Sequence, residues 1–314
     1  MSTLSDHQVE HYGSIGRLLR SPVESIDLAT FCDRFQARRI RVRLADMAAA
    51  AREPALIGRL RGALGDVLMR TASPQAASGR PCPWDPPSAF EALFRKQGRM
   101  TPGTDFPSPW VLALQPRRGA LDVMLTLFGV ACEWAPAAAE ALVEGCARID
   151  WRSAAGVFVP AMAVIDRRMQ RVAIEEREIG QTLVLEFLSP LVVSSQNPVE
   201  APAAAFKSFS LRLEGLARWH GLTLAAVDWG AMKAALRAAD WTWTDTEFAD
   251  WRRGSRRQDR WIAMSGVLGR LHIAASHDAM MQISPLLRLG ANTHVGADIA
   301  FGCGRYRILE LVDR

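Results

Sequence analysis

Residues 38–44 read Arg-Arg-Ile-Arg-Val-Arg-Leu and carry the first strong structural signal in this chain of 314 residues. Apolar residues at positions 40, 42 and 44 alternate with arginines, which is the pattern of a β-strand with one buried and one open face. The open face then carries a row of guanidinium groups, on Arg39, Arg41 and Arg43. This row is either a solvated outer face or a surface for an anionic partner.

The segments that follow this strand predict a first α+β unit. A helix is expected over about 56–70, and Pro116–Gly119 marks a hairpin turn before an apolar strand at 121–129. A second helix at about 135–148 and one or two strands within 155–174 complete the unit. The order strand, helix, strand, strand, helix, strand is that of a ferredoxin-like domain.

The second half of the chain repeats this order. We expect a strand at 181–193, then a helix at about 202–219 and a shorter one at 228–239. A hairpin within 260–275, a helix at 279–289, a glycine-rich loop and a closing strand follow. The predicted organisation is an N-terminal arm (1–33), a first domain (34–178) and a second domain (179–314).

Composition excludes several classes of protein. Hydrophobic residues make up 49% and charged residues 23%, as in globular domains, so disorder is not the dominant state. No uncharged apolar run reaches the ~18 residues of a membrane span, and the first residues lack a secretory signal pattern. The five cysteines include no CxxC pair. They are typical of reduced thiols in a cytoplasmic protein without a zinc site.

The charge balance favours a phosphate-bearing partner without establishing one. The net charge is +5, and 35 of the 38 basic residues are arginine. A GC-rich genome produces the same bias, yet arginine is also the side chain best suited to phosphate because its planar fork donates to two oxygens. The densest basic run stands directly before the expected hairpin and comprises Arg252, Arg253, Arg256, Arg257 and Arg260. It is either a solvated loop or a grip on an RNA backbone.

The last sixty residues carry a family resemblance. Gly266-Val267-Leu268-Gly269, Leu289-Gly290 with Val295-Gly296, and Phe301-Gly302-Cys303-Gly304-Arg305-Tyr306 occur in the order seen in the CRISPR-associated RAMP endoribonucleases that process precursor CRISPR RNA (Cas family six). Leu60–Gly65 and Leu127–Gly129 are similar to motifs of the first domain of that family. The resemblance covers roughly residues 38–312.

The resemblance implies two tandem ferredoxin-like (RRM-like) domains, a C-terminal glycine-rich loop and CRISPR repeat RNA as the partner. It implies cleavage without metal or cofactor, in which the 2′-hydroxyl of the RNA attacks the adjacent phosphate and leaves a 2′,3′-cyclic phosphate. Such chemistry needs a base, an acid and cations around the charged phosphorane. Amides of the glycine-rich loop are expected to cradle phosphate, through Gly296, Gly302 and Gly304, with Arg305 beside them.

One departure from the family pattern concerns catalysis. Residues 70–78, where many members carry their general acid/base histidine, contain none. The remaining candidates for catalysis are His294 in the glycine-rich loop, His220 at a helix end, and Arg61. His220 has an alternative explanation as a helix cap.

Three functions therefore stay open. The first is a metal-independent endoribonuclease, which the order of motifs over both domains favours. The second is a non-cleaving RAMP subunit that binds guide RNA with other Cas proteins in an effector complex, which the missing histidine favours. The third, a general RRM-like RNA binder, is disfavoured by the terminal motif. None of the three requires a membrane.

Overall fold

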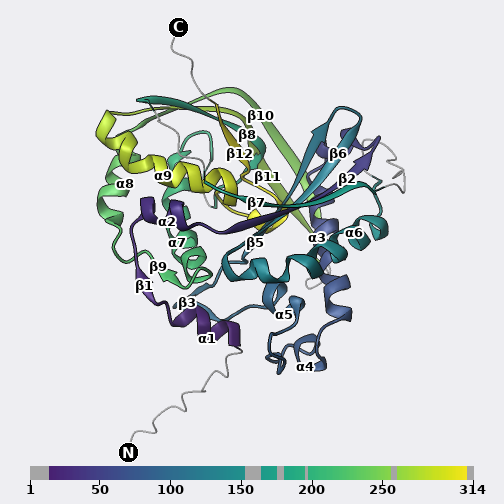
Figure 1. Cartoon of the computed structure of the whole chain (residues 1–314). Coiled ribbons are helices and arrows are strands. Elements are labelled where there is room, and N and C mark those ends of the chain that lie inside the picture. The colour runs from purple at the N-terminus through teal and green to yellow at the C-terminus, as the bar shows by residue number, and fades with distance from the viewer. Residues whose placement is uncertain (1–13, 153–163, 175–179, 195–196, 256–259, 310–314) are drawn as a thin grey trace, which may run out of the picture.

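Two four-stranded antiparallel sheets, each covered on one face by helices, make up the molecule (Figure 1). The computed structural model describes residues 14–152, 164–174, 180–194, 197–255 and 260–309. The mixed helix and sheet content and the two successive sheets confirm the predicted α+β class. Within the described residues, no helix combines the length and the apolar character needed to cross a bilayer.

The N-terminal sheet has the ferredoxin-like strand order β5-β6-β2-β7. Its strands and the two helices packed on it are β2 (Ala37–Ala45), α3 (Ala55–Arg70), β5 (Trp110–Arg117), β6 (Ala120–Phe128), α6 (Ala135–Arg148) and β7 (Val164–Val172). Shorter elements join them: η1 (Ala48–Arg52), α4 (Pro74–Ala77), α5 (Ala89–Phe94), β3 (Arg99–Thr101), β4 (Thr104–Asp105) and η2 (Gly129–Trp134). The alternation in β2 behaves as predicted, because Ile40, Val42 and Leu44 are all buried.

The C-terminal sheet has the corresponding order β10-β11-β8-β12. Its strands and helices are β8 (Thr182–Leu191), α7 (Ala203–Arg218), β9 (Leu222–Thr223), α8 (Trp229–Ala238), β10 (Asp240–Ser255), β11 (Arg260–Ala274), α9 (His277–Thr293), η3 (Ile299–Phe301) and β12 (Tyr306–Leu309). Trp241 and Trp243 of β10 pack against the core beneath the sheet, and their indole N–H groups donate to backbone carbonyls.

The hairpin predicted within 260–275 is wrong. Residues 260–274 form one continuous strand, which pairs with β10 from Asp240↔Ala274 to Ser255↔Arg260. The glycines of this stretch serve another purpose than a turn. A Cβ at Gly266 would lie 2.8 Å from the Leu191 carbonyl oxygen, and Gly269 has φ +141 opposite the bulge in β10. The glycines therefore allow close approach of the neighbouring strands. The true hairpin is longer and joins β10 to β11.

The expected N-terminal arm is in large part folded. Residues 1–13 lie outside the described part of the chain, but α1 (Ser14–Arg20), β1 (Glu24–Ser25) and α2 (Leu28–Arg34) follow. Ile15 and Leu19 are buried in the N-terminal core, whereas Phe31 is fully buried in the C-terminal one. In Figure 1, α2 lies against α9. The first 33 residues therefore include a segment that joins both domains.

A second connection runs in the opposite direction. Trp219, at the end of α7, is buried in the N-terminal core, and its indole N–H donates to the Pro107 carbonyl over 3.0 Å. The Trp219 carbonyl in turn accepts from the Val130 amide at 2.8 Å. The predicted domain boundary at 178/179 falls within residues 175–179, which are outside the described ranges, so its position stays a prediction.

Candidate nucleic-acid interface

Two arginines, one from each domain, meet at a single aromatic ring. Arg61 of α3 has its guanidinium carbon 5.3 Å from the centroid of the Phe301 ring, and Arg253 of β10 lies at 4.1 Å. The β10–β11 hairpin reaches across to α3 (Figure 1), which brings Arg253 to the first domain. Both were predicted site residues, and the structure brings them together. Phe301 was noticed only as part of a motif.

Within the described residues, this arginine pair has no anionic partner. No ion pair of Arg61 or Arg253 occurs among the described residues, and the Nε atom of each is buried without a hydrogen-bond acceptor. Burial lowers the pKa of Arg61, and the nearby charge of Arg253 lowers it further. Two like charges held together in a partly buried place are costly. An anion that lies between them would relieve both the repulsion and the missing hydrogen bonds.

A second group of cations surrounds His294. Its side chain is 3% exposed, and its Nδ1 atom has no hydrogen-bond partner. Burial, followed by the charges of Arg305 and Arg212, holds the pKa of His294 well below its ordinary value. Arg39 contributes in the same direction. His294 is therefore a neutral imidazole near neutral pH.

Arg305 connects this group to the first domain. Its guanidinium donates to the Leu114 carbonyl and to Oε1 of Gln115, both at 3.1 Å. Burial lowers its pKa to about 10, and the same cause lowers that of Arg212 to about 10. A cavity of about 70 Å³ is lined by both Arg305 and Phe301, so Arg305 borders the same hollow as the ring on which Arg61 and Arg253 meet. Arg212 was missed from sequence, where its only signal was a cation within an apolar helix.

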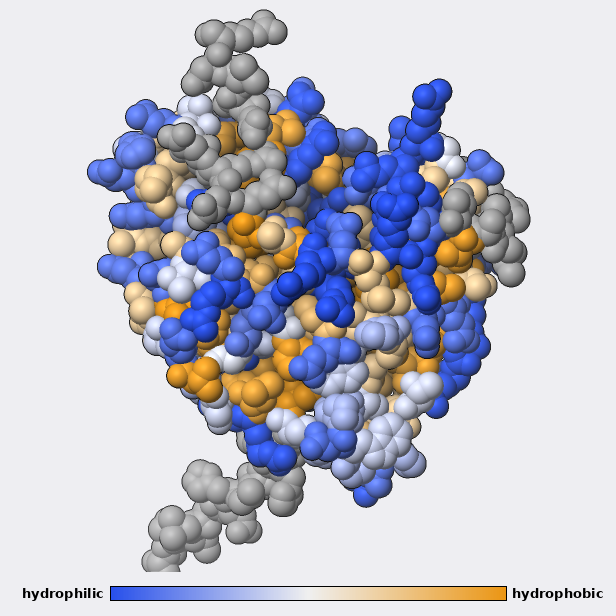
Figure 2. All heavy atoms as spheres, viewed as in Figure 1, coloured by the Kyte–Doolittle hydropathy of each residue, from blue (hydrophilic) through white to orange (hydrophobic). Residues whose placement is uncertain are grey.

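The predicted arginine row on β2 splits into free and paired members. Arg41 forms an ion pair with Asp166 at 2.6 Å, and Arg43 forms one with the buried Asp122 at 2.7 Å. Arg39 has only a 3.4 Å hydrogen bond to Thr126 and no ion pair in the described ranges. Figure 2 shows hydrophilic residues gathered over this sheet, at the upper right. Of the three, Arg39 is the one available to an anion.

Gly302 and Gly304 do not offer their amides to the phosphate cradle expected from sequence. The Gly304 amide donates to the Pro190 carbonyl, and that of Gly302 donates to Ile299, both at 2.9 Å. Both amides are therefore hydrogen-bonded within the protein and are not free to bind phosphate. A Cβ at Gly304 would lie 1.7 Å from the Val295 carbonyl oxygen, and one at Gly296 would lie 2.3 Å from that of Val192. The glycines are needed for backbone packing in a positive-φ conformation.

Both ring nitrogens of His220 contact backbone groups of the protein itself. Its Nδ1 lies 2.8 Å from the Leu216 carbonyl, and its Nε2 accepts from the Gln36 amide at 3.1 Å. The imidazole also stacks on Phe35, with ring centroids 5.0 Å apart. Burial lowers its pKa. With both nitrogens engaged, His220 joins the two domains and is not available to a substrate.

The remaining predicted residues fall into two sets. Arg252 is exposed on β10, one position before Arg253. Arg256 and Arg257 lie outside the described residues, as does the side chain of Arg260, so their predicted contact with RNA stays a prediction. In the ranges that the structure describes, no group of three or more His, Cys, Asp or Glu side chains is arranged to hold a metal ion.

Comparison with known proteins supports the sequence resemblance. A family model described as CRISPR-associated endoribonuclease Cas6 matches residues 185–306, and a second, described only as an N-terminal domain, matches residues 35–153. Among curated proteins no significant match was found.

Solved structures share the fold over most of the chain. Thermus thermophilus Cas6 (TTHB231) is 16% identical, with a TM-score of 0.53, and the match covers 88% of this chain and 99% of that one. A TTHB231 product complex is 14% identical, with a TM-score of 0.50 over 87% and 99% of the two chains. These matches show the tandem ferredoxin-like fold. The second domain, over residues 185–306, is in addition similar to the CRISPR-associated endoribonuclease Cas6 family.

Proposed function

We propose that this chain binds CRISPR repeat RNA between its two domains and cleaves it without metal. The family match supports a role in binding and processing CRISPR RNA. In the proposed reaction, the 2′-hydroxyl attacks the adjacent phosphorus and the bond to the 5′-oxygen breaks. The products are a 2′,3′-cyclic phosphate and a 5′-hydroxyl end. The observation that carries the proposal is the pairing of Arg61 and Arg253 on Phe301.

The arginine pair suits the charge that develops in this reaction. The phosphorane formed during attack carries more negative charge than the starting diester, so cations fixed nearby stabilise it preferentially. Guanidinium groups donate two parallel hydrogen bonds to phosphate oxygens. Because Phe301 holds both groups before RNA arrives, little reorganisation is needed at the moment of reaction.

Proton transfer is the weaker part of this site. His294 is neutral and buried, and His220 is engaged on both nitrogens. One positioned acid or base typically contributes ~100- to 10,000-fold to the rate. We therefore expect slow, single-turnover cleavage. Its rate should show no inflection from His294 near pH 6.5, because the pKa of that residue is lowered well below this value.

The test uses end-labelled repeat RNA in EDTA under single-turnover conditions. Arg61→Ala and Arg253→Ala should each slow cleavage by about 100-fold, as loss of one oxyanion donor does. Two neighbours serve as matched controls. Arg59 lies on the same helix but donates to the backbone carbonyls of Asp150 and Arg152, and Arg252 adjoins Arg253 on an exposed position. Cleavage that depends equally on the controls would contradict the proposed site.

A non-cleaving subunit is the second candidate function. It is favoured by the engagement or burial of both candidate histidines. The same assay separates the two functions. Tight binding of repeat RNA without cleavage between pH 5 and 9 would support a guide-RNA-binding subunit that assembles with other Cas proteins.

A further inference from the structure

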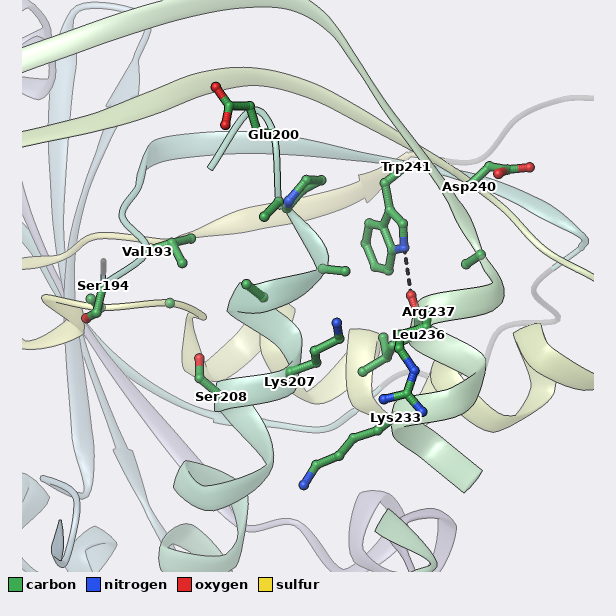
Figure 3. Close-up of a pocket in the computed structure, with 17 residues that line it drawn as sticks. Val193, Ser194, Glu200, Lys207, Ser208, Lys233, Leu236, Arg237, Asp240 and Trp241 are labelled. Carbon is green, nitrogen blue, oxygen red and sulfur yellow. Dashed lines mark hydrogen bonds between the residues drawn. The ribbon is translucent and has the colours of Figure 1, made fainter. Parts of the chain in front are cut away.

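A large pocket opens in the C-terminal domain, on the helical side of the sheet. It lies between α7, α8 and the start of β10, and it has a volume of about 1000 Å³ (Figure 3). Residues 193–194 and 296–297 close its remaining side. The loop after α9 therefore borders this α7–α8 pocket through Gly296 and Ala297, while its Phe301 belongs to the site described above. No residue of the arginine pair lines the pocket.

Three cations line this pocket. Lys207 comes from α7, and Lys233 and Arg237 come from α8, one helical turn apart. Figure 3 shows their side chains extending into the open space between the two helices. None of the three forms an ion pair in the described part of the chain. Like charges four residues apart on a helix repel each other, and Lys207 adds a third charge from the opposite wall.

The carboxylates at the rim do not neutralise these cations. Glu200 and Asp240 line the pocket, but Figure 3 shows both carboxylates turned away from its interior. The Glu200 carboxylate instead accepts a hydrogen bond from the side-chain Nδ2 of Asn197 at 3.0 Å. The first turn of α7 also faces the pocket, and its N-cap residue, Pro202, offers no side-chain acceptor. The positive end of the helix dipole adds to the local potential.

An aromatic wall accompanies the positive charge. Trp241 lines the pocket and is only half-buried. Its position is fixed, because its indole N–H donates to the Leu236 carbonyl at 3.0 Å and its ring stacks on Phe206 with centroids 5.2 Å apart. A rigid indole next to cations is the combination with which proteins bind a nucleotide, since the ring contacts the base while the cations contact the phosphate.

We propose that the α7–α8 pocket binds a ribonucleotide phosphate. Lys207, Lys233 and Arg237 hold the phosphate, and Trp241 contacts the base. The ligand is either a free nucleotide or one nucleotide of an RNA strand that continues past the loop after α9. Only the second source rests on the function proposed above, because binding of a free nucleotide requires no cleavage.

The test is calorimetric titration of the full chain with AMP, adenosine and inorganic phosphate. AMP should bind, adenosine should not, and inorganic phosphate should bind more weakly than AMP. The variants Lys207→Gln and Arg237→Gln should each weaken AMP binding by about tenfold, as expected for loss of a charge-assisted hydrogen bond. The matched control is Lys96→Gln. Lys96, the remaining lysine of the chain, pairs with Asp105 on the other domain, so its substitution should leave AMP binding unchanged.

Competition identifies the source of the nucleotide. If AMP displaces a labelled single-stranded RNA, and the pocket variants bind that RNA more weakly than wild type does, the ligand is part of an RNA strand. If AMP binds while RNA affinity is unchanged in the variants, the ligand is a free nucleotide. No binding of AMP, or equal binding by the pocket variants and wild type at equal melting temperature, would overturn the proposal. Absence of RNA cleavage would leave these titrations unaffected.

Discussion

Gly304 shows, at the scale of one residue, how tightly the loop after α9 is packed. It has φ +73, and a Cβ there would lie 1.7 Å from the Val295 carbonyl oxygen. Gly304→Ala should therefore lower the free energy of unfolding by about 3 kcal/mol, from the left-handed backbone and the overpacking together. Chemical denaturation followed by circular dichroism measures this change.

Gly103 provides the matched control for Gly304. It also has positive φ, at +83, but a Cβ added there would meet no other atom within 4 Å. Gly103→Ala should therefore cost only about 1 kcal/mol, the penalty of the left-handed conformation alone. Equal losses in the two variants would show that the loop is not packed as described.

His294 makes the stability of the fold depend on pH. Its folded-state pKa lies well below 6.5 because of burial and of the charges of Arg305 and Arg212. In the unfolded chain the imidazole takes up a proton near pH 6.5, while the folded protein resists it. Stability is thus fully present above that pH and is lost as the pH falls below it, by at most about 1.4 kcal/mol per pH unit.

The variant His294→Asn isolates this contribution. Asparagine keeps a polar side chain at this position but does not titrate, and any cost of the backbone conformation (φ 62, ψ 159) is the same at both pH values. Urea unfolding at pH 7 and pH 5 should show a smaller loss of stability in the variant than in wild type. His220 also has a lowered pKa and contributes to both proteins equally. An identical loss in the two proteins would rule out His294 as the source.

Residue types at the site were predictable, but their surroundings were not. Arg61, Arg253 and His294 were identified from type and motif alone. That His294 is buried, and that Arg253 meets Arg61 on Phe301, depends on contacts between segments far apart in the sequence. The phosphate cradle predicted at Gly302 and Gly304 was wrong for the same reason. A local glycine pattern does not reveal which backbone carbonyls accept hydrogen bonds from the loop amides.

The arginines along strand β2 should contribute unequally to RNA binding. Its arginines are alike in sequence and differ in partners. Arg39→Gln should reduce the salt dependence of RNA binding by about 0.7 log per log salt, the share of one single-strand phosphate contact. Arg43→Gln should leave the salt dependence nearly unchanged, since Asp122 already neutralises Arg43. Filter binding over a range of salt concentrations measures both.

Arg43→Gln should instead lower the free energy of unfolding. Asp122 is fully buried and accepts from both Arg43 and Arg117. Burial alone would raise its pKa, but the hydrogen bonds from Arg43 and Arg117 outweigh this and lower it. Removing one donor should cost about 1 to 2 kcal/mol at pH 7. The difference from wild type should shrink as the pH falls below 3.8, the ordinary pKa of Asp122, because protonation removes the ion pair in both proteins.

Helices and strands followed periodicity closely, with one instructive failure. The alternating pattern placed β2 correctly, and the apolar segments placed α3, β6, α6 and α7 within a few residues. The failure was the glycine pair in β11. A hairpin was predicted within 260–275, although Gly266 and Gly269 in this stretch accommodate β8 and the β10 bulge. In a sequence, a glycine that forms a turn cannot be told from one that allows a neighbouring strand to approach closely. The difference becomes visible only when the neighbouring strand is known.

The whole molecule should unfold as one unit. Trp219 comes from the second half of the chain but is buried in the N-terminal core, and Arg305 donates to carbonyl and amide oxygens of β5. Each domain thus lacks part of its packing without the other. Calorimetry should give a single thermal transition that coincides with the loss of far-ultraviolet circular dichroism. Two separated transitions would show that the domains are independent.

The position of α2 has a consequence for the order of events during synthesis on the ribosome. Phe31 packs into the C-terminal core, and Cys32 lies 3.7 Å from the carbonyl of Pro285 in α9. Chain elongation proceeds at about 5–20 residues per second, so α9 is made tens of seconds after α2. Translation therefore exposes the apolar side of α2 throughout this interval. Nascent-chain protection of Phe31 should appear last, although the ribosome makes this residue among the first.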